Sequence, residues 1–343
     1  MRALLALLLV ALLLAPPLRA QDADADWQAI LALDAGPSRK ITSREEARTV
    51  GFEFLARQEE ALRAFLARHP SDPRALDAKL RLAYLLTTRS DLAEDPKLYK
   101  AAVALLEAAL EEAPEPRRAD VAFAQVALAM RRMPIPDDEE RHLLAAQALS
   151  FQKRFPNDAR IAPLLAEVAA LYDDQPKRQA SYLKEALRSA RTDALRAQVS
   201  DDLKRLSLLG HPVPIEGTTE EGTAISLAGL RGKVAVFYFF AGWSPPSLAA
   251  LQEAQYLRRA FPPEKVAILG VNLDPTREAL HAAGKDAGFP ILWEPKGWQS
   301  PLVRGLAINR LPALWIFDPK GRLRSTSTRI ATEPLIRQLL KER

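Results

Sequence analysis

The sequence changes character near residues 210–214, and this change constrains the fold more than any other feature. From Trp27 to about Leu209 the chain is poor in glycine, and its apolar residues recur at three- and four-residue spacings, which predicts successive amphipathic helices. Beyond this point, prolines and glycines separate short β-rich runs from helical ones, which indicates an α/β sheet covered on both faces. We therefore expect an all-helical domain at 21–209 and an α/β domain at 210–343.

Short apolar runs locate the strands of the second domain. The run at 234–240 is apolar throughout and is predicted to be the central buried strand. Further strands are expected at 266–271 and 313–317. Helices are expected after Pro246, from Thr276 and near Glu333.

Three similar blocks recur in the helical half. They share a proline that ends one helix, a short polar link, and an alanine inside the next helix, and they comprise Pro70, Arg74 and Ala83; Pro114, Arg118 and Ala127; and Pro156, Arg160 and Ala169. The junctions at 65–72 and 151–158 resemble those of tetratricopeptide repeats, although the period is longer than the roughly 34 residues of that family. The alternative to tetratricopeptide-like hairpins is an irregular helical bundle with coincidental prolines.

The first residues have the layout of a secretory signal peptide. Arg2 is followed by the apolar run 3–15, and cleavage is expected after Ala20, so that 1–20 is the signal peptide. The alternative is a membrane anchor, but the run is shorter than the roughly 20 residues that span a bilayer. We expect a mature chain without a membrane span, located in the periplasm or secreted.

Composition excludes several classes of function. The 343 residues contain no cysteine, and only a thiolate can attack a disulfide and be regenerated, so the chain has no dithiol chemistry of its own. The formal charge of +5 is too small for a nucleic-acid footprint, and we expect no nucleic-acid partner. The four histidines are dispersed without the spacing of metal ligands, so no metal or other cofactor is expected.

Several ordered motifs in the second domain resemble one family. They are Leu230-Arg231-Gly232-Lys233, Ala241-Gly242-Trp243-Ser244-Pro245-Pro246-Ser247, Gly270-Val271-Asn272-Leu273-Asp274, Gly297-Trp298-Gln299-Ser300-Pro301-Leu302 and the run from Leu311-Pro312 to Gly321. Together they resemble the TlpA/ResA thioredoxin-like proteins, redoxins related to AhpC/TSA proteins. The resemblance implies a thioredoxin-like fold for the second domain. It also implies a site where these proteins carry Trp-Cys-Pro-Pro-Cys.

That site is degenerate in this chain. Ser244 and Ser247 replace both cysteines, and Ala250 replaces a glutamate that assists proton transfer in the family. The loss of the neighbouring charged residues as well favours natural divergence. The alternative is a TlpA-like thiol-disulfide oxidoreductase, which would require cysteine codons at 244 and 247 in the native gene.

No catalytic residue is therefore expected at the degenerate positions. A serine nucleophile needs a neighbouring general base, and neither His211 nor His281 lies in a motif that would place one there. We expect Ser244 to cap the helix and Pro245 or Pro246 to occupy its first turn. A remote alternative is that Ser244 binds the thiolate of an external thiol such as glutathione.

The remaining expectation is peptide binding. Pro312 matches the family's cis-proline, beside which related proteins bind an extended peptide, while the tryptophan of the motif adds an apolar rim. The candidate surface comprises Trp243, Pro245, Pro246, Leu311 and Pro312. Alternatively, Pro312 serves only the turn that the fold needs. The hypothesis is an exported, redox-inactive scaffold for a protein or peptide of the cell envelope.

Overall fold

A computed structural model describes residues 23–37, 42–132, 137–327 and 331–342. The chain divides into two compact units, one formed by Met1–Pro136 with Leu149–Phe155 and the other by Asp137–Ala148 with Pro156–Arg343. This division does not follow the composition change near residue 210. The expected signal peptide at 1–20 lies outside the described residues. No described helix combines the length and apolarity needed to cross a bilayer.

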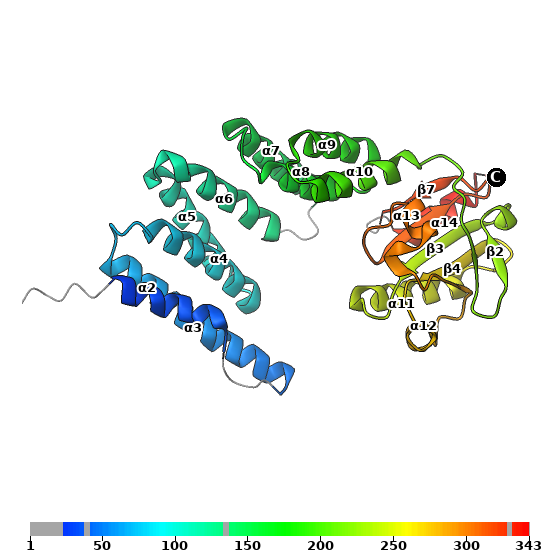
Figure 1. The fold of residues 1–343 in the computed structure, drawn as a ribbon, viewed down its shortest axis with the longest axis horizontal. Helices are drawn as coiled ribbons and strands as arrows, with labels where there is room; N and C mark the ends of the chain where they lie inside the picture. Colours follow the sequence, from blue (N-terminus) through cyan, green and yellow to red (C-terminus); the bar gives the residue numbers. More distant parts are fainter. Residues whose placement is uncertain (1–22, 38–41, 133–136, 328–330, 343) are drawn as a thin grey trace, which may run out of the picture. The chain divides into compact units, whose positions relative to one another are not determined.

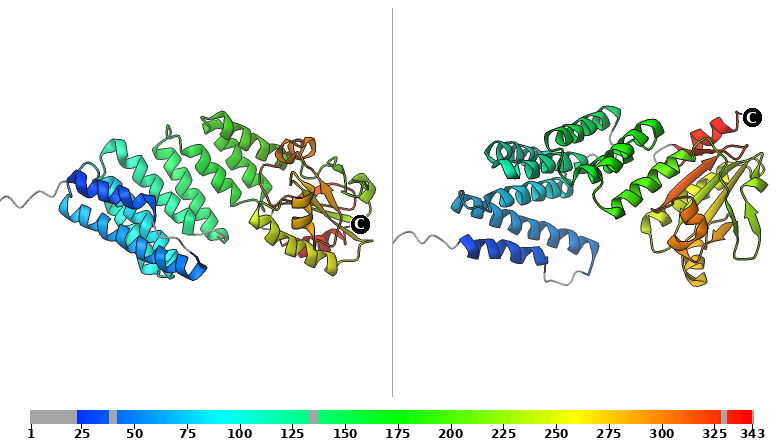
Figure 2. Two further views of the ribbon diagram at one scale, coloured as in Figure 1. Left: turned by 60° about the horizontal axis from the view of Figure 1, so that its bottom comes forward. Right: turned by 45° about the horizontal axis from the view of Figure 1, so that its top comes forward.

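The first unit is helical, and its successive helices lie side by side (Figures 1 and 2). They are α2 (Ala23–Ala32), η1 (Leu33–Ala35), α3 (Arg44–Arg68), α4 (Ala75–Ala93), α5 (Pro96–Glu112), η2 (Glu115–Arg117) and α6 (Arg118–Arg132). Helix α7 (Asp138–Arg154) crosses the division between the units. Its acidic start is a capping box, because the Glu140 N–H donates to Asp137 and the Asp137 N–H donates to Glu140.

The recurrent prolines lie in links between helices, as the repeats predict. Pro70 lies between α3 and α4, and Asp72 in the same link accepts hydrogen bonds from the backbone and guanidinium of Arg74. The link between α7 and α8 (Ile161–Ala170) has the same arrangement, in which Asp158 accepts from Arg160. Each aspartate therefore closes the turn that starts the following helix.

The second unit continues with helices and then a sheet. Its elements after α8 are α9 (Pro176–Ser189), α10 (Asp193–Ser207), β1 (Glu216–Thr218), β2 (Ala224–Ser226), η3 (Ala228–Leu230), β3 (Val234–Phe240), α11 (Pro245–Ala260), β4 (Val266–Asn272), α12 (Arg277–Gly284), β5 (Ile291–Trp293), η4 (Gly297–Gln299), α13 (Pro301–Gly305), β6 (Ala313–Phe317), β7 (Leu323–Ser325) and α14 (Thr332–Leu339). The expected strands and helices of the α/β domain are thus confirmed.

The main sheet has the order β5-β4-β3-β6-β7, which confirms β3 as its central strand. Strands β3, β4 and β5 run parallel, whereas β6 and β7 are antiparallel to their neighbours. Every residue of β3 is buried because both faces of the sheet are covered. Together with the covering helices, this mixed sheet forms a thioredoxin-like fold.

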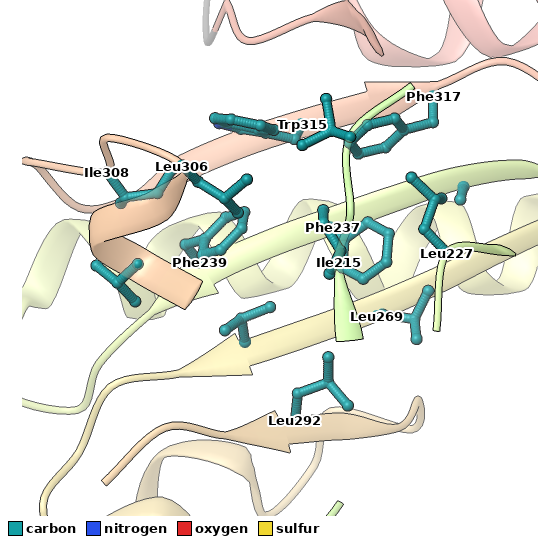
Figure 3. Packing of buried hydrophobic residues seen from close by; sticks show 14 of the residues in the cluster. Ile215, Leu227, Phe237, Phe239, Leu269, Leu292, Leu306, Ile308, Trp315 and Phe317 are labelled. Carbon is teal, nitrogen blue, oxygen red and sulfur yellow. The ribbon is translucent and has the colours of Figure 1, made fainter. Parts of the chain in front are cut away.

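Alternate residues of β3 enter two separate cores. Val236 and Tyr238 face a core shared with α11 and α14. Phe237 and Phe239 face the other core, where their rings lie 5.7 Å and 5.9 Å from those of Phe317 and Trp315 (Figure 3). Residues of α13 and of the segment around β1 and β2 complete this second core. The two cores fix the ends of β3 and β6, where the candidate site lies.

Helix α10 packs on the sheet domain within the second unit. The buried Arg205 side chain donates a 2.6 Å hydrogen bond to the carbonyl of Ala307, and the Gly210 N–H donates to the carbonyl of Leu323. Leu208 and Leu209 pack against the core that contains Trp315. These contacts explain why α8–α10 group with the sheet although their composition matches the helical half.

Candidate functional site

The two serines of the degenerate motif lie at the start of α11. Ser244 is the N-cap residue and Pro245 begins the helix, as predicted. The predicted side-chain cap is wrong, however, because the Ser244 hydroxyl accepts no backbone N–H. It is instead hydrogen-bonded to the hydroxyl of Ser247 at 2.9 Å. Both side chains are buried, so the hydroxyls satisfy each other where the family carries its two thiols.

The loop before Ser244 is held by a buried carboxylate that sequence reasoning did not single out. Asp274 accepts hydrogen bonds from the Gly242 N–H at 2.8 Å and from the side-chain amide of Asn272 at 2.7 Å. A Cβ on Gly242 would approach this carboxylate to 3.3 Å, so the glycine permits the close contact. In the sequence, Asn272 and Asp274 stand out as polar residues at the end of an apolar run. They belong to a motif from which only the fold was predicted.

No general base adjoins the serine pair among the described residues. Ala250 is half-buried on α11 and carries no ionisable group. Tyr238 of β3 is buried, and burial, together with the charge of Glu253, raises the pKa of its phenol above the ordinary range. Neither His211 nor His281 forms a hydrogen bond with either serine, and the His281 ring pairs with Glu220. Among the described residues, neither serine hydroxyl is hydrogen-bonded to an ionisable side chain.

Exposed apolar side chains surround the start of α11. Trp243 is 54% exposed, and Pro245 and Pro246 are also exposed. The Trp243 ring lies 6.1 Å from that of Trp298, which is 37% exposed. Trp298 extends the apolar rim, and sequence reasoning gave it no role beyond the fold motif. Exposed tryptophans in contact are a common feature of binding surfaces.

The cis-proline lies beside this rim through strand pairing. The Leu311–Pro312 peptide bond is cis, as expected. Because Ala313 pairs with Phe239, the residues before Ala313 continue alongside the end of β3 and the loop that leads to Trp243. Leu311 and Pro312 are both half-buried, so part of each remains open to solvent. Of the expected residues, Trp243 lies in the loop after β3, Pro245 and Pro246 lie in the first turn of α11, and Leu311 and Pro312 lie just before β6.

Comparison with known families agrees with this fold. Residues 209–326 match the AhpC/TSA family, which makes this segment a redoxin domain and places the match on the sheet domain alone. None of the curated proteins matches this chain.

Several solved structures also resemble part of the chain. One is a thiol-disulfide oxidoreductase from Bacteroides fragilis, 24% identical over 37% of this chain and 97% of that one, with a TM-score of 0.34. Another is a thiol-disulfide isomerase from Corynebacterium glutamicum, 21% identical over 39% and 100% of the two chains, with a TM-score of 0.35. A third is the thioredoxin domain of a thiol-disulfide oxidoreductase from Bacteroides vulgatus, 19% identical over 39% and 96%, also with a TM-score of 0.35.

Proposed function

We propose that this chain is an exported, redox-inactive thioredoxin-like protein of the TlpA/ResA type that binds a peptide or protein segment in the cell envelope. The observation that carries the proposal is the hydroxyl pair of Ser244 and Ser247, which are buried and hydrogen-bonded to each other at 2.9 Å. A thiol-free pair of this kind can neither accept nor donate electrons. The scaffold around it nevertheless retains the fold motifs.

The apolar rim supports the binding half of the proposal. Trp243 and Trp298 offer two large rings at the start of α11, and the cis-proline loop lies beside them. Aromatic anchors of this kind supply much of the affinity of small recognition surfaces. An extended peptide that runs along Leu311 would bury both rings.

The helical unit offers a second surface for the same role. A groove of about 520 Å³ is lined mainly by apolar residues of the first unit. Tyr84 on its edge is 64% exposed, and the guanidinium of Arg131 lies 4.6 Å above the Tyr84 ring. Tetratricopeptide-like hairpins commonly bind partners in such grooves, and we propose that this unit acts as a scaffold.

The proposed export rests on the sequence of the first residues. A signal peptide ending at Ala20 would deliver the chain to the periplasm or beyond. Fusion of residues 1–30 to a reporter that is active only outside the cytoplasm tests this step. Activity that disappears when the apolar run 3–15 is interrupted by arginine supports export, and an inactive native fusion contradicts it.

Peptide binding is tested by calorimetry with short cysteine-free peptides rich in aromatic and aliphatic side chains. Trp243→Ala is expected to weaken the affinity at least about tenfold, since it removes the more exposed of the two tryptophans of the rim. Tyr256→Ala is the matched control, because Tyr256 is a similarly exposed aromatic residue of α11 that lies outside the rim. Equal losses in both variants, or no binding by the native chain, would refute the proposal.

A further inference from the structure

Helix α10 is joined by a closed set of hydrogen bonds to the cis-proline loop, residues 307–312. Arg205 donates to the carbonyl of Ala307 at 2.6 Å and to the side-chain oxygen of Asn309 at 3.2 Å. Asp202, one turn earlier on α10, accepts from Arg205 and, at 3.1 Å, from the side-chain amide of Asn309. The loop is therefore tied to α10 just before its cis peptide bond.

The first residue of this loop has a strained backbone. Ala307 has a φ of 55°, in the left-handed region that alanine rarely adopts. Its carbonyl is the one to which Arg205 donates. Strained residues persist where the surrounding structure fixes them, and they are concentrated at functional sites. The bond from Arg205 therefore supports a backbone conformation that an alanine does not favour by itself.

Core packing fixes only the start of the loop. Leu306 and Ile308 flank Ala307 in the core that Figure 3 shows. Further along, a cavity of about 240 Å³, the cavity beside Pro312, adjoins the loop, and Asn309 and Pro312 are among the residues that line it. Atoms that face a void have no packing partners on that side. The hydrogen bonds from α10 therefore matter more for the position of this part of the loop than they would in a filled core.

Burial of Arg205 is unfavourable unless its charge and its donors are bonded. The residue is only 8% exposed. Burial lowers the pKa of its guanidinium, while the charge of Asp202 opposes this change and the charge of Arg310 adds to it. An apolar side chain could pack α10 on the sheet domain without this cost. Packing of α10 alone therefore does not explain an arginine at this position.

We propose that Arg205 is a positioning residue for the peptide surface: it holds the cis-proline loop so that Leu311 and Pro312 face a bound peptide. This inference rests on the proposed function, because it assigns a role at the same surface. Since α10 belongs by composition to the helical half, the helical half contributes to peptide binding without contacting the peptide.

The first measurement follows the loop itself, by hydrogen exchange of backbone amides in the full chain. The amides of Ala307 and Ile308 are the reporters, because both form backbone hydrogen bonds at the end of α13. In Arg205→Gln they are expected to exchange at least about fivefold faster, since the bonds that oppose opening of the loop are lost. The amides of β3 should exchange as in the native chain, which shows that the change is local.

The second measurement is the calorimetric affinity for short cysteine-free peptides rich in aromatic and aliphatic side chains. Arg205→Gln is expected to weaken binding at least about fivefold, because a displaced loop no longer completes the surface. Asn309→Ala keeps the bond from Arg205 to Ala307, so it should cause smaller changes in both measurements. It also provides the test if Arg205→Gln does not fold.

Arg196→Gln is the matched control. Arg196 is another arginine of α10 that donates to a backbone carbonyl, but its acceptor is Ala190, outside the loop. This variant should change neither the exchange of the loop amides nor the peptide affinity. Trp243→Ala should weaken peptide binding and leave the exchange of the loop amides unchanged.

The outcomes separate this inference from the proposed function. Unchanged loop exchange in Arg205→Gln, with peptide binding by the native chain intact, would overturn the positioning role alone. Faster loop exchange with unchanged peptide affinity would overturn it too, because the loop would then be held for another reason. If the native chain binds none of the peptides, the proposed function and this inference fail together.

Discussion

The serine site at the start of α11 and the cavity beside Pro312 belong to the same domain but differ in how their buried polar groups are bonded. At the serine site, the two hydroxyls bond to each other, and Asp274 accepts from both Gly242 and Asn272. In the cavity, the Trp315 indole N–H has no hydrogen-bond partner among the described residues. At the serine site the named polar groups are hydrogen-bonded to one another, whereas the buried indole donor of the cavity is not bonded within the described residues.

The largest change in the chemistry of the serine site is expected when cysteines replace its two serines. The double substitution Ser244→Cys and Ser247→Cys places two thiols at positions whose hydroxyls are already in contact at 2.9 Å, so a small side-chain adjustment would bring the sulfurs to the roughly 2.05 Å of a disulfide bond. We expect an intramolecular disulfide and insulin reduction, whereas we expect neither from the native chain. Turnover should stay slow because Ala250 supplies no carboxylate for proton transfer.

Mass spectrometry before and after alkylation measures disulfide formation in the double variant. Ser244→Cys alone is the control, since the chain has no other thiol with which to form an intramolecular bond. Two thiols that stay free in air would show that the side chains at 244 and 247 do not reach the geometry of a disulfide bond.

Removal of Asp274 is expected to give the largest change in stability. Asp274→Ala leaves the Gly242 N–H and the Asn272 amide without their acceptor, and each such loss costs about 1–3 kcal/mol. We expect the free energy of unfolding, measured with urea, to fall by about 2–6 kcal/mol. Glu264→Ala, at an exposed position, should change it by no more than about 0.5 kcal/mol. A loss no larger than the control's would mean that the loop does not need this carboxylate.

A smaller decrease in the free energy of unfolding is expected when the hydrogen bond between the two serine hydroxyls is removed. Ser247→Ala removes the 2.9 Å hydrogen bond to Ser244, and such a bond contributes about 1 kcal/mol to stability. Urea unfolding of the variant should show a decrease of that size with an unchanged slope. An increase in stability would instead mean that the serine pair is strained.

The smallest effect on stability is expected in the link between α3 and α4. There the Asp72 carboxylate accepts hydrogen bonds from Arg74. Hydrogen bonds from the side chain and N–H of Arg74 lower the pKa of Asp72 to about 2. Because the folded pKa lies below the unfolded value of about 3.9, this stabilisation is complete above that value and is lost as the pH falls toward 2. Urea titrations should therefore show native chain and Asp72→Asn differing at pH 7 and converging near pH 2. A difference that does not vary with pH would contradict this assignment.

Local patterns in the amino-acid sequence were sufficient to predict much of the fold of the sheet domain. The bounds of β3 and β6 coincide with the apolar runs because a buried strand requires apolar residues at every position. Thr276 caps α12, since its side chain accepts from the Ala279 N–H as an N-terminal threonine should. The cis peptide bond at Pro312 could be predicted because the resemblance placed a cis-proline at this position of the motif.

The site was less predictable because it depends on tertiary contacts. Ser244 occupies the predicted N-cap position, but Ser247 competes for its hydroxyl across one helical turn. The pairing of Trp243 with Trp298 joins segments that no local pattern connects. The cavity beside Pro312 likewise takes Arg205 from α10, which the composition assigns to the helical half.

The most direct test of the account measures peptide affinity in four chains: the native protein, Trp243→Ala, Trp298→Ala and the double variant. The two rings lie 6.1 Å apart and would be covered by the same peptide. We expect each single variant to weaken binding at least about fivefold, and the double variant to lose less than the sum of the two free-energy changes, as neighbouring residues do. Unchanged peptide affinity in the double variant would contradict the proposal that this surface, rather than a thiol pair, is what the domain uses.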